Sequence, residues 1–139
     1  ILTLIERQKL IAEGAGAVSV AAALFNKEDE KGKKTECLVS GGNIDVTILS
    51  RVISRGLLKE GRLGRMVIEM SDRPGQLKEV SAIIAELGGN VVSVHHDRGG
   101  EETDINACTL SIQMETRNRA HLKQIREAIT RAGYRIAAE

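Results

Sequence analysis

The sequence predicts an α+β protein in which residues 63–139 form a ferredoxin-like unit of order β-α-β-β-α-β. Two observations predict this order. Apolar and polar side chains alternate at residues 66–71 and again at 107–115, which is the two-residue period of a strand. Apolar residues recur at helical spacing over 77–87 and 122–129, in each case after one of these strands. We expect both helices to cover one face of an antiparallel sheet.

Residues 1–62 are predicted to form a separate and mainly helical segment. Residues 1–9 carry a helical stripe of apolar side chains, which Glu13-Gly14-Ala15-Gly16 interrupt. Residues 17–25 are apolar nearly all round, which predicts a helix that is buried on most sides. The charged stretch 26–35 is expected to be a surface loop.

A short apolar strand is predicted at residues 36–39, and it ends in Ser40-Gly41-Gly42-Asn43. The next helix covers residues 45–58 and stops at Gly56 or Gly61. Residues 59–65 combine two glycines with alternating charge, which is typical of a linker, so we divide the chain into 1–62 and 63–139. The helix before this linker is expected to turn four apolar side chains inward, namely Val46, Leu49, Val52 and Ile53.

The turn that follows residues 66–71 has the chemistry of a helix start. Pro74 suits the first helical turn because its φ is already helical and it has no N–H to leave unpaired. Asp72 is placed to cap the free N–H groups that follow it, and Gly88-Gly89 end the helix. A helix N-terminus that opens directly off a strand can hold a small anion such as a carboxylate. The buried stripe of this helix is predicted to consist of Leu77, Val80, Ile84 and Leu87.

A second strand opens at Asn90 and runs to His96. Residues 97–104 are polar and include Gly99-Gly100, which suits a hairpin turn. The second helix ends at Gly133, and residues 134–137 form a last short strand. In the strand at 107–115, one face is apolar and is expected to be buried: Cys108, Leu110, Ile112 and Met114.

Composition narrows the function classes. A formal net charge of +1 and an aromatic content of 1% argue against nucleic-acid binding, because stacking platforms are missing. The apolar runs are too short to cross a membrane. Cys37 and Cys108 fit no metal spacing and are expected to be free thiols in the reducing cytoplasm. Glu60 interrupts a basic run that is expected to be a solvated face or a subunit surface: Arg51, Arg55, Lys59, Arg62 and Arg65.

The pair His95-His96 invites a metal-binding interpretation. Neighbouring residues of a strand point to opposite faces of the sheet, so the two imidazoles cannot easily chelate one ion. We therefore predict no metal site in this chain.

Three motifs in residues 72–98 together resemble the ACT domain, a small module that binds amino acids in metabolic enzymes; they are Asp72-Arg73-Pro74-Gly75-Gln76-Leu77, Gly88-Gly89-Asn90-Val91 and His96-Asp97-Arg98. The resemblance implies a homo-oligomer in which the turn of one chain and the second strand of a dimer partner enclose an amino-acid effector. Gly75 would let that ligand approach the backbone closely. The implied effector-binding residues are Asp72, Arg73, Pro74, Gly75, Gln76, Leu77, Asn90 and Val91.

The local chemistry of this turn also fits an ordinary strand-to-helix turn, and many ACT domains serve only to join subunits. Exposed edges of the small sheet suit dimer formation across a two-fold axis.

Two motifs further upstream, residues 12–17 and Ser40-Gly41-Gly42-Asn43, resemble the end of the catalytic domain of threonine dehydratase, also called threonine ammonia-lyase. This family depends on pyridoxal phosphate, and its catalytic domain has the fold type II of such enzymes. The resemblance implies that Ser40, with Gly41 beside it, binds the cofactor in the parent enzyme. The serine hydroxyl would hydrogen-bond the pyridine nitrogen and tune the electron sink.

The lysine that forms the Schiff base in this family stands in a Ser-Phe-Lys-x-Arg-Gly context, which does not occur in the sequence. The glycine-rich phosphate loop of the family is missing too. We therefore expect no catalytic residue in this chain, no cofactor bound to it, and no threonine deamination by it alone. Ile1 is not an initiator methionine, so we expect a piece of a longer polypeptide.

The resulting hypothesis is the C-terminal regulatory part of a cytoplasmic threonine dehydratase, which converts L-threonine to 2-oxobutanoate and ammonia in isoleucine biosynthesis or threonine catabolism. The alternative is a stand-alone amino-acid-binding or oligomerisation module with no catalytic role. The two differ over residues 1–62. The end of a catalytic domain should expose apolar surface that the rest of that domain would cover, whereas an independent module should not.

Overall fold

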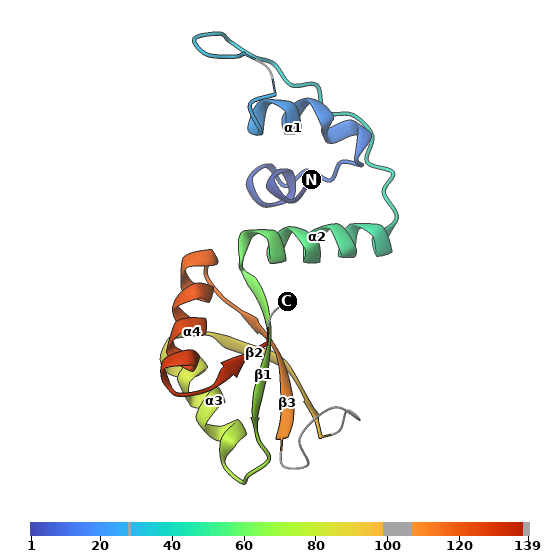
Figure 1. The fold of residues 1–139 in the computed structure, drawn as a ribbon. Helices are drawn as coiled ribbons and strands as arrows, with labels where there is room; N and C mark the ends of the chain where they lie inside the picture. Colours follow the sequence, from blue (N-terminus) through green and yellow to red (C-terminus); the bar gives the residue numbers. More distant parts are fainter. Residues whose placement is uncertain (28, 99–106, 138–139) are drawn as a thin grey trace. The chain divides into compact units, whose positions relative to one another are not determined.

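The computed structural model describes residues 1–27, 29–98 and 107–137. The chain divides into two compact units, Ile1–Gly56 and Leu57–Glu139 (Figure 1). The predicted hairpin turn at 97–104 lies mostly outside the described residues.

The second unit is a four-stranded antiparallel sheet of order β2-β3-β1-β4, with two helices on one face (Figure 1). The chain visits these elements in the order β-α-β-β-α-β, which confirms the predicted ferredoxin-like α+β fold. The elements are β1 (Leu63–Ser71), α3 (Gln76–Glu86), β2 (Asn90–Asp97), β3 (Ala107–Glu115), α4 (Arg119–Arg131) and β4 (Arg135–Ile136).

The core of this unit lies between the sheet and the two helices. The predicted alternation of β1 and β3 is confirmed, because every second residue of each strand is buried and faces the helices. The strands are paired so that Met66 lies opposite Ile112 and Met70 opposite Cys108. The largest fully buried side chains are Met66, Ile68, Val80, Ile84, Leu110, Ile112, Met114, Ile125 and Ile129.

The start of α3 differs from the prediction. Its N-cap residue is Gly75, with a φ of 96°, and no side chain caps the helix. Pro74 belongs to the turn before the helix and not to its first turn. The prediction that Asp72 caps α3 is wrong, because its carboxylate pairs with Arg98 instead. The predicted end is confirmed: the chain leaves the helix at Gly88, with a φ of 82°.

The first unit is held by a small cluster of buried side chains, Leu4, Ala12 and Ala17. Its helices are a π-helix at Leu4–Gln8, a 3₁₀ turn at Ala15–Ala17, α1 (Val18–Leu24) and most of α2 (Val46–Glu60).

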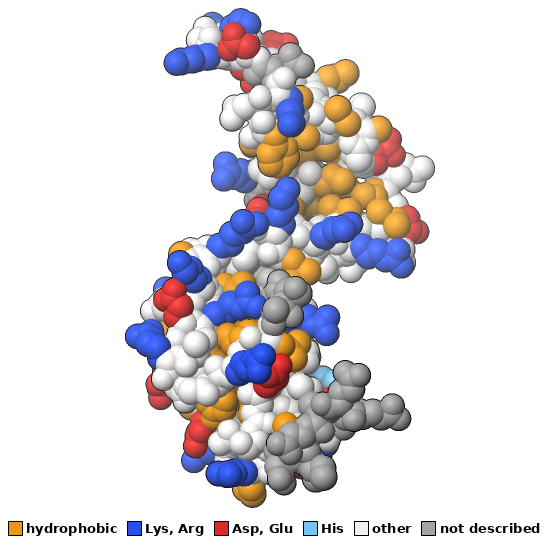
Figure 2. Space-filling view, viewed as in Figure 1, with side chains coloured by type: hydrophobic (Ala, Val, Ile, Leu, Met, Phe, Trp, Pro, Cys, Tyr) orange, Lys and Arg blue, Asp and Glu red, His pale blue; other side chains and the backbone are white. Residues whose placement is uncertain are grey.

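Two predictions for the first unit are wrong. The helix predicted to be buried on most sides, α1, has no buried residue, and Val18 and Phe25 are each 62% exposed. Figure 2 shows hydrophobic side chains gathered on the surface of this unit. Residues 36–39 do not form a strand, because a strand needs a neighbouring strand to pair with. The Ser19 hydroxyl of α1 instead donates to the carbonyl of Leu38 at 2.6 Å.

The helix α2 runs two residues past its predicted end at 58 and stops directly before Gly61, which was one of its two predicted stops. It passes through Gly56 and ends at Glu60, after which Gly61 turns the chain with a φ of 68°. Of the four side chains predicted to face inward, Leu49, Val52 and Ile53 are half-buried but Val46 is 76% exposed. The predicted linker at 59–65 is also wrong, because α2 continues to Glu60 and β1 begins at Leu63.

None of the described helices is long and apolar enough to cross a membrane. Both cysteines are free, as predicted; Cys37 is exposed and Cys108 is buried.

Tyr134, the only tyrosine of the chain, reports on the core of the second unit. Its hydroxyl donates to Oε2 of Glu79 on α3 at 2.6 Å. Burial, and then the hydrogen bond and charge of Glu79, raise the pKa of Tyr134 to about 12. Because the folded state holds this proton more tightly than the unfolded state, the contribution to stability is complete below pH 10 and is lost as the pH rises toward 12.

We therefore expect an absorbance titration of the folded chain to show phenolate formation near pH 12, and near pH 10 in denaturant. Glu79→Gln should lower the folded-state midpoint but not return it to 10, since burial is the larger cause. A wild-type midpoint near 10 in the folded chain would contradict the burial of this hydroxyl.

Candidate functional site

A cavity of about 410 Å³ lies where β1 leaves the sheet and α3 begins. All six residues of the predicted effector turn line it: Asp72, Arg73, Pro74, Gly75, Gln76 and Leu77. The remaining lining comes from the ends of the strands, namely Met70, Ser71, His96, Arg98, Cys108 and Leu110.

The turn leaves room beside its backbone. A Cβ added at Gly75 would meet no atom within 4 Å, so this glycine is required by its φ of 96° and not by crowding within the chain. Leu77 is 44% exposed, and its predicted place in the buried stripe of α3 is wrong. Because it stands in the first turn of the helix, its side chain lines the cavity.

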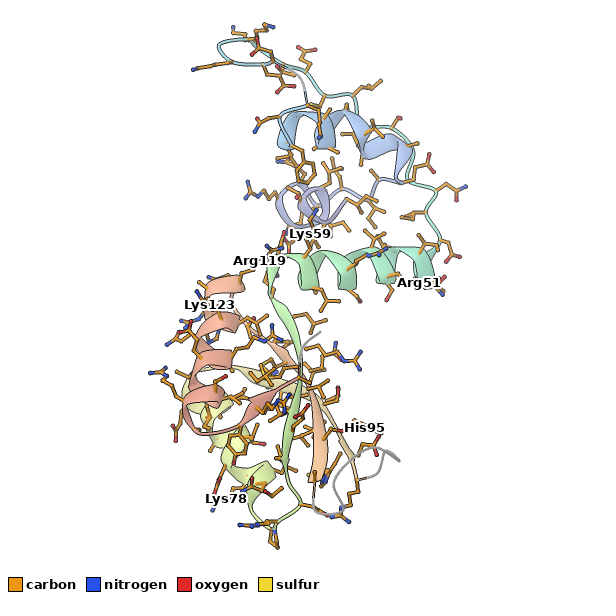
Figure 3. All side chains as sticks on the ribbon, in the orientation of Figure 1. Arg51, Lys59, Lys78, His95, Arg119 and Lys123 are labelled. Carbon is orange, nitrogen blue, oxygen red and sulfur yellow. The ribbon has the colours of Figure 1, made fainter. Side chains whose placement is uncertain are left out.

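The Asp72 carboxylate lies close to two basic side chains of the cavity, Arg98 and His96. Its Oδ2 pairs with Nε of Arg98 at 3.1 Å, and its Oδ1 lies 3.9 Å from Nε2 of His96. His96 is opposite the buried Leu110 in the ladder between β2 and β3, so it points to the helix side of the sheet. His95 is opposite Ser111 and points to the other side, as Figure 3 shows. The prediction that the two imidazoles face apart is confirmed.

Cys108 forms part of the cavity's inner wall. It is buried on β3 opposite Met70. Burial raises the pKa of the Cys108 thiol, the Asp72 carboxylate raises it further, and Arg98 opposes the change. Sequence reasoning placed Cys108 on the buried face but did not connect it with Asp72 and His96, because the register between strands decides which residues meet.

The residues 62–133 match the model of a family described as "ACT domain". The chain belongs to the ACT domain family. Its relatives include an L-threonine ammonia-lyase of Thermotoga maritima, 46% identical over 98% of this chain, and one of Geobacter sulfurreducens, 38% identical over 98%. The biosynthetic L-threonine dehydratase IlvA of Lactococcus lactis is 41% identical over 56% of this chain and 19% of its own length.

The chain spans 34% of the length of each of the two ammonia-lyases, and the matched part is their C-terminal part. These alignments include the first unit as well as the ACT domain, whereas the alignment with the dehydratase of L. lactis covers little more than half of the chain.

Two of the predicted effector residues do not line the cavity of their own ACT domain. Asn90 and Val91 lie at the opposite end of β2, where they are paired with Glu115 and Met114. The Asn90 amide donates to Oε2 of Glu115 at 2.9 Å. A contribution of these residues to an effector site therefore requires a second copy of the chain, which is the arrangement that the resemblance implied.

In the first unit the two motifs that resemble threonine dehydratase lie against each other. The N–H of Glu13 donates to the carbonyl of Gly41 at 2.9 Å, and the N–H of Ser40 donates to the carbonyl of Gly16 at 3.3 Å. A Cβ at Gly16 would overlap the Ser40 carbonyl, so this close approach requires glycine.

Ser40, which the resemblance implies as a partner of the pyridine nitrogen of pyridoxal phosphate, is exposed. The lysine motif and the phosphate loop of that family have no counterpart in the sequence.

Proposed function

We propose that this chain is the C-terminal regulatory part of a pyridoxal-phosphate-dependent threonine ammonia-lyase, and that its ACT domain binds an amino-acid effector in the 410 Å³ cavity. The observation that supports this is that all six turn residues line one cavity. The cavity also has the three kinds of group that an amino acid needs: the Asp72 carboxylate for an ammonium, Arg73 and Arg98 for a carboxylate, and Leu77 for an apolar side chain.

The parent enzyme in this proposal converts L-threonine to 2-oxobutanoate and ammonia, and residues 1–62 complete its catalytic domain. Two observations support this over a stand-alone module. Two ammonia-lyases align with 98% of the chain, including the first unit. The first unit also exposes large apolar side chains, with Leu38 at 83% and Phe25 at 62%, which is the surface that a further part of a catalytic domain would cover (Figure 2).

We further propose that two ACT domains pair through the edge strand β2. It is the longer edge, with eight residues against two in β4. A bulge between Val91 and Ser93 interrupts its ladder with β3, and Val92 there is 53% exposed. Such pairing uses the backbone groups that an edge strand leaves unpaired, and it would bring Asn90 and Val91 to the partner's cavity.

Replacing Gly75 by alanine tests the effector site. The methyl group would enter the space beside the turn, where we expect the ligand to touch the backbone. We expect calorimetric titration of the wild-type chain with isoleucine, valine, threonine and serine, in the presence of a metal chelator, to show saturable binding of at least one of them. Gly75→Ala should weaken this binding by about tenfold or more, equivalent to about 1.4 kcal/mol.

Gly88→Ala is the matched control. Gly88 has a φ of 82°, and a Cβ there also meets no atom within 4 Å, but the residue lies at the other end of α3. Both variants should lose about 1 kcal/mol of stability from the left-handed backbone, and only Gly75→Ala should lose affinity. Equal affinities in the two variants would overturn the site assignment. A folded dimeric chain that binds none of the four amino acids would leave joining of subunits as the function.

A further inference from the structure

Three side chains of metal-ligating type meet in the cavity of the ACT domain. They are Asp72, His96 and Cys108, and one ligand atom of each lies within 4.8 Å of the others. Within residues 1–27, 29–98 and 107–137 this is the one group of three or more such residues with that geometry.

The fold brings these residues together from separate elements. His96 stands on the edge strand β2, opposite Leu110 of β3. Cys108 stands two residues before Leu110 on the same strand, so both side chains face the helix side of the sheet. Asp72 directly follows β1, at the end where Ser71 is paired with Ala107. The three side chains therefore converge from a rigid sheet and from the turn that leaves it.

The geometry of Asp72 is suited to a ligand. Arg98 holds its Oδ2 at 3.1 Å, so that Oδ1 is directed to Nε2 of His96 at 3.9 Å. In a tetrahedral zinc site with Zn–N and Zn–O bonds of about 2.0–2.2 Å, the two ligand atoms lie about 3.4 Å apart. Oδ1 of Asp72 and Nε2 of His96 are 3.9 Å apart, and both side chains are 35% exposed, so small rotations can bring them to this spacing and toward the thiol. Arg98 would act as an outer partner that orients the ligating carboxylate.

We propose that Asp72, His96 and Cys108 form a Zn²⁺ site in the ACT cavity. Zinc would bind Oδ1 of Asp72, Nε2 of His96 and Sγ of Cys108, and its fourth position would face the open part of the cavity and carry water. Nitrogen, sulfur and carboxylate oxygen are the donors that zinc takes in proteins, and three protein ligands with one open position make a four-coordinate site. This site goes beyond the proposed effector function and does not depend on it.

The state of the thiol sets the proton balance. Burial raises the pKa of the Cys108 thiol, so without metal it is protonated at neutral pH. Zinc binds the thiolate, so binding releases the thiol proton to the buffer, and the affinity should rise with pH. A buried thiol of this kind is a poor nucleophile when no metal is bound.

The test uses the complete chain without a histidine tag and with Cys37→Ser, which removes the exposed thiol of the other unit. Cobalt(II) is added as a spectroscopic substitute for zinc. We expect one cobalt per chain, with absorption bands of tetrahedral cobalt and a thiolate-to-cobalt charge-transfer band, and displacement of both by one equivalent of zinc. No saturable cobalt or zinc binding by this protein would overturn the proposal.

Two pairs of variants locate the site. Cys108→Ser should remove the charge-transfer band, whereas Cys37→Ser alone should keep it. His96→Ala should weaken zinc binding by about tenfold or more, whereas His95→Ala, on the other side of the sheet, should leave it unchanged.

Because Cys108 is buried, the Cys108→Ser variant can fail to fold. In that case Asp72→Asn and His96→Ala test the zinc site, because both positions are partly exposed and tolerate substitution. Cobalt spectra and affinities unchanged in both would overturn the site. Amino-acid titrations are made with a chelator present, so failure of the effector proposal and failure of the zinc site give separate results.

Discussion

Replacing His121 by alanine should lower the free energy of unfolding of the ACT domain by about 3 kcal/mol. His121 is 4% exposed, and within the described residues it is the one buried side chain that does not belong to the apolar, tyrosine and cysteine side chains of the core. Its Nε2 lies 2.8 Å from the carbonyl of Leu87, at the end of α3, and the N–H of Arg117 donates to its Nδ1 at 3.0 Å.

These two contacts fix the role of the imidazole. Because the N–H of Arg117 can only donate, Nδ1 must accept, and the hydrogen of the neutral ring is on Nε2, which donates to Leu87. The ring thus joins the last turn of α3 to the approach to α4, where no backbone ladder connects them. Alanine would remove the imidazole partner of a partly buried carbonyl and of a partly buried N–H, each at about 1–3 kcal/mol, and would also open a cavity.

The measurement follows the fluorescence of Tyr134 during denaturant unfolding. Tyr134 is the only tyrosine, the chain has no tryptophan, and this residue lies in the ACT domain, so the signal reports this domain alone. His95→Ala is the control, because His95 is exposed on the other side of the sheet and should change stability by less than about 0.5 kcal/mol. Similar midpoints for the two variants would show that the imidazole does not join the helices.

His121 also shows where reasoning from the sequence stops. The helical spacing of Leu122, Ile125 and Ile129 predicted α4, and the two isoleucines are fully buried. A histidine carries no apolar signal, so its place in the core could not be read from periodicity. Leu122, which was predicted to be part of the stripe, only packs partly buried against the core. Burial of His121 follows from two backbone groups that need partners, and such groups are visible only in three dimensions.

Only the part of the candidate site that is contiguous in sequence could be predicted. The turn from Asp72 to Leu77 is contiguous in sequence, and all of it lines the cavity. The other half of the lining comes from the end of β1, from β3, and from the end of β2 with the residue that follows it. The bulge in β2 sets which residues of β2 and β3 are paired near the cavity. The wrong assignment of Asp72 as a helix cap has the same origin. The sequence suggests only local partners for Asp72, whereas its partner in the structure is Arg98, which is distant in sequence.

The first unit was predicted least well because its sequence pattern describes contacts that this chain does not supply. Residues 36–39 have the composition of a strand but no strand to pair with, and α1 has the apolar surface of a buried helix but few neighbours. Periodicity identifies what a segment could bury. The remainder of the molecule determines whether it does so.

Replacing Gly61 by alanine should destabilise the ACT domain by about 3 kcal/mol, far more than the same change at Gly88. Gly61 has a φ of 68°, which costs an alanine about 1–2 kcal/mol. In addition, a Cβ there would lie 2.7 Å from Cα of Arg119 and 2.8 Å from its backbone nitrogen. These are backbone atoms of α4, so they cannot rotate away as the end of a side chain can.

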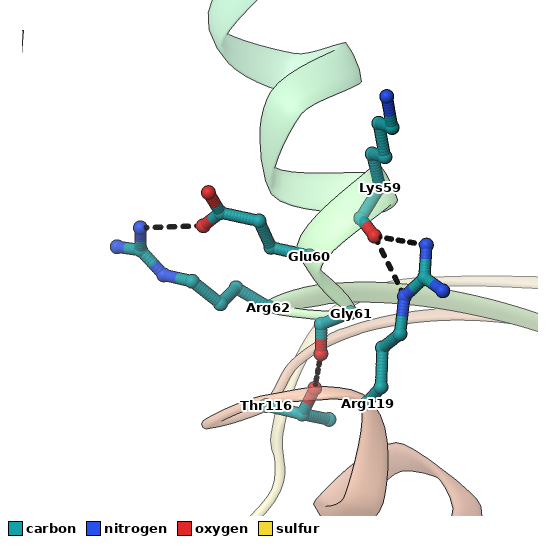
Figure 4. A network of polar contacts seen from close by, with 6 residues as sticks. All are labelled: Lys59, Glu60, Gly61, Arg62, Thr116 and Arg119. Carbon is teal, nitrogen blue, oxygen red and sulfur yellow. Dashed lines mark hydrogen bonds and ion pairs between the residues drawn. The ribbon is translucent and has the colours of Figure 1, made fainter. Parts of the chain in front are cut away.

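Hydrogen bonds around Gly61 hold residues 59–62 against the start of α4, so the two segments cannot move apart to relieve the clash (Figure 4). The Arg119 guanidinium donates through Nε to the carbonyl of Lys59 at 2.7 Å, and the Thr116 hydroxyl donates to the carbonyl of Gly61. The N–H of Thr116 donates to the carbonyl of Arg62 at 2.8 Å. Relief of the clash would break these hydrogen bonds, which we estimate at about 1 kcal/mol each.

Gly88→Ala separates the two causes. It has the same left-handed backbone but open space at the Cβ, so it should lose only the conformational part, about 1 kcal/mol. The difference between the two variants in Tyr134-monitored unfolding then measures the contact of Gly61 with α4. If the two variants were equally stable, α4 would be free to move away from the turn. The hydrogen bonds of Lys59, Gly61 and Arg62 would then not hold the N-terminal end of α4 against the start of β1.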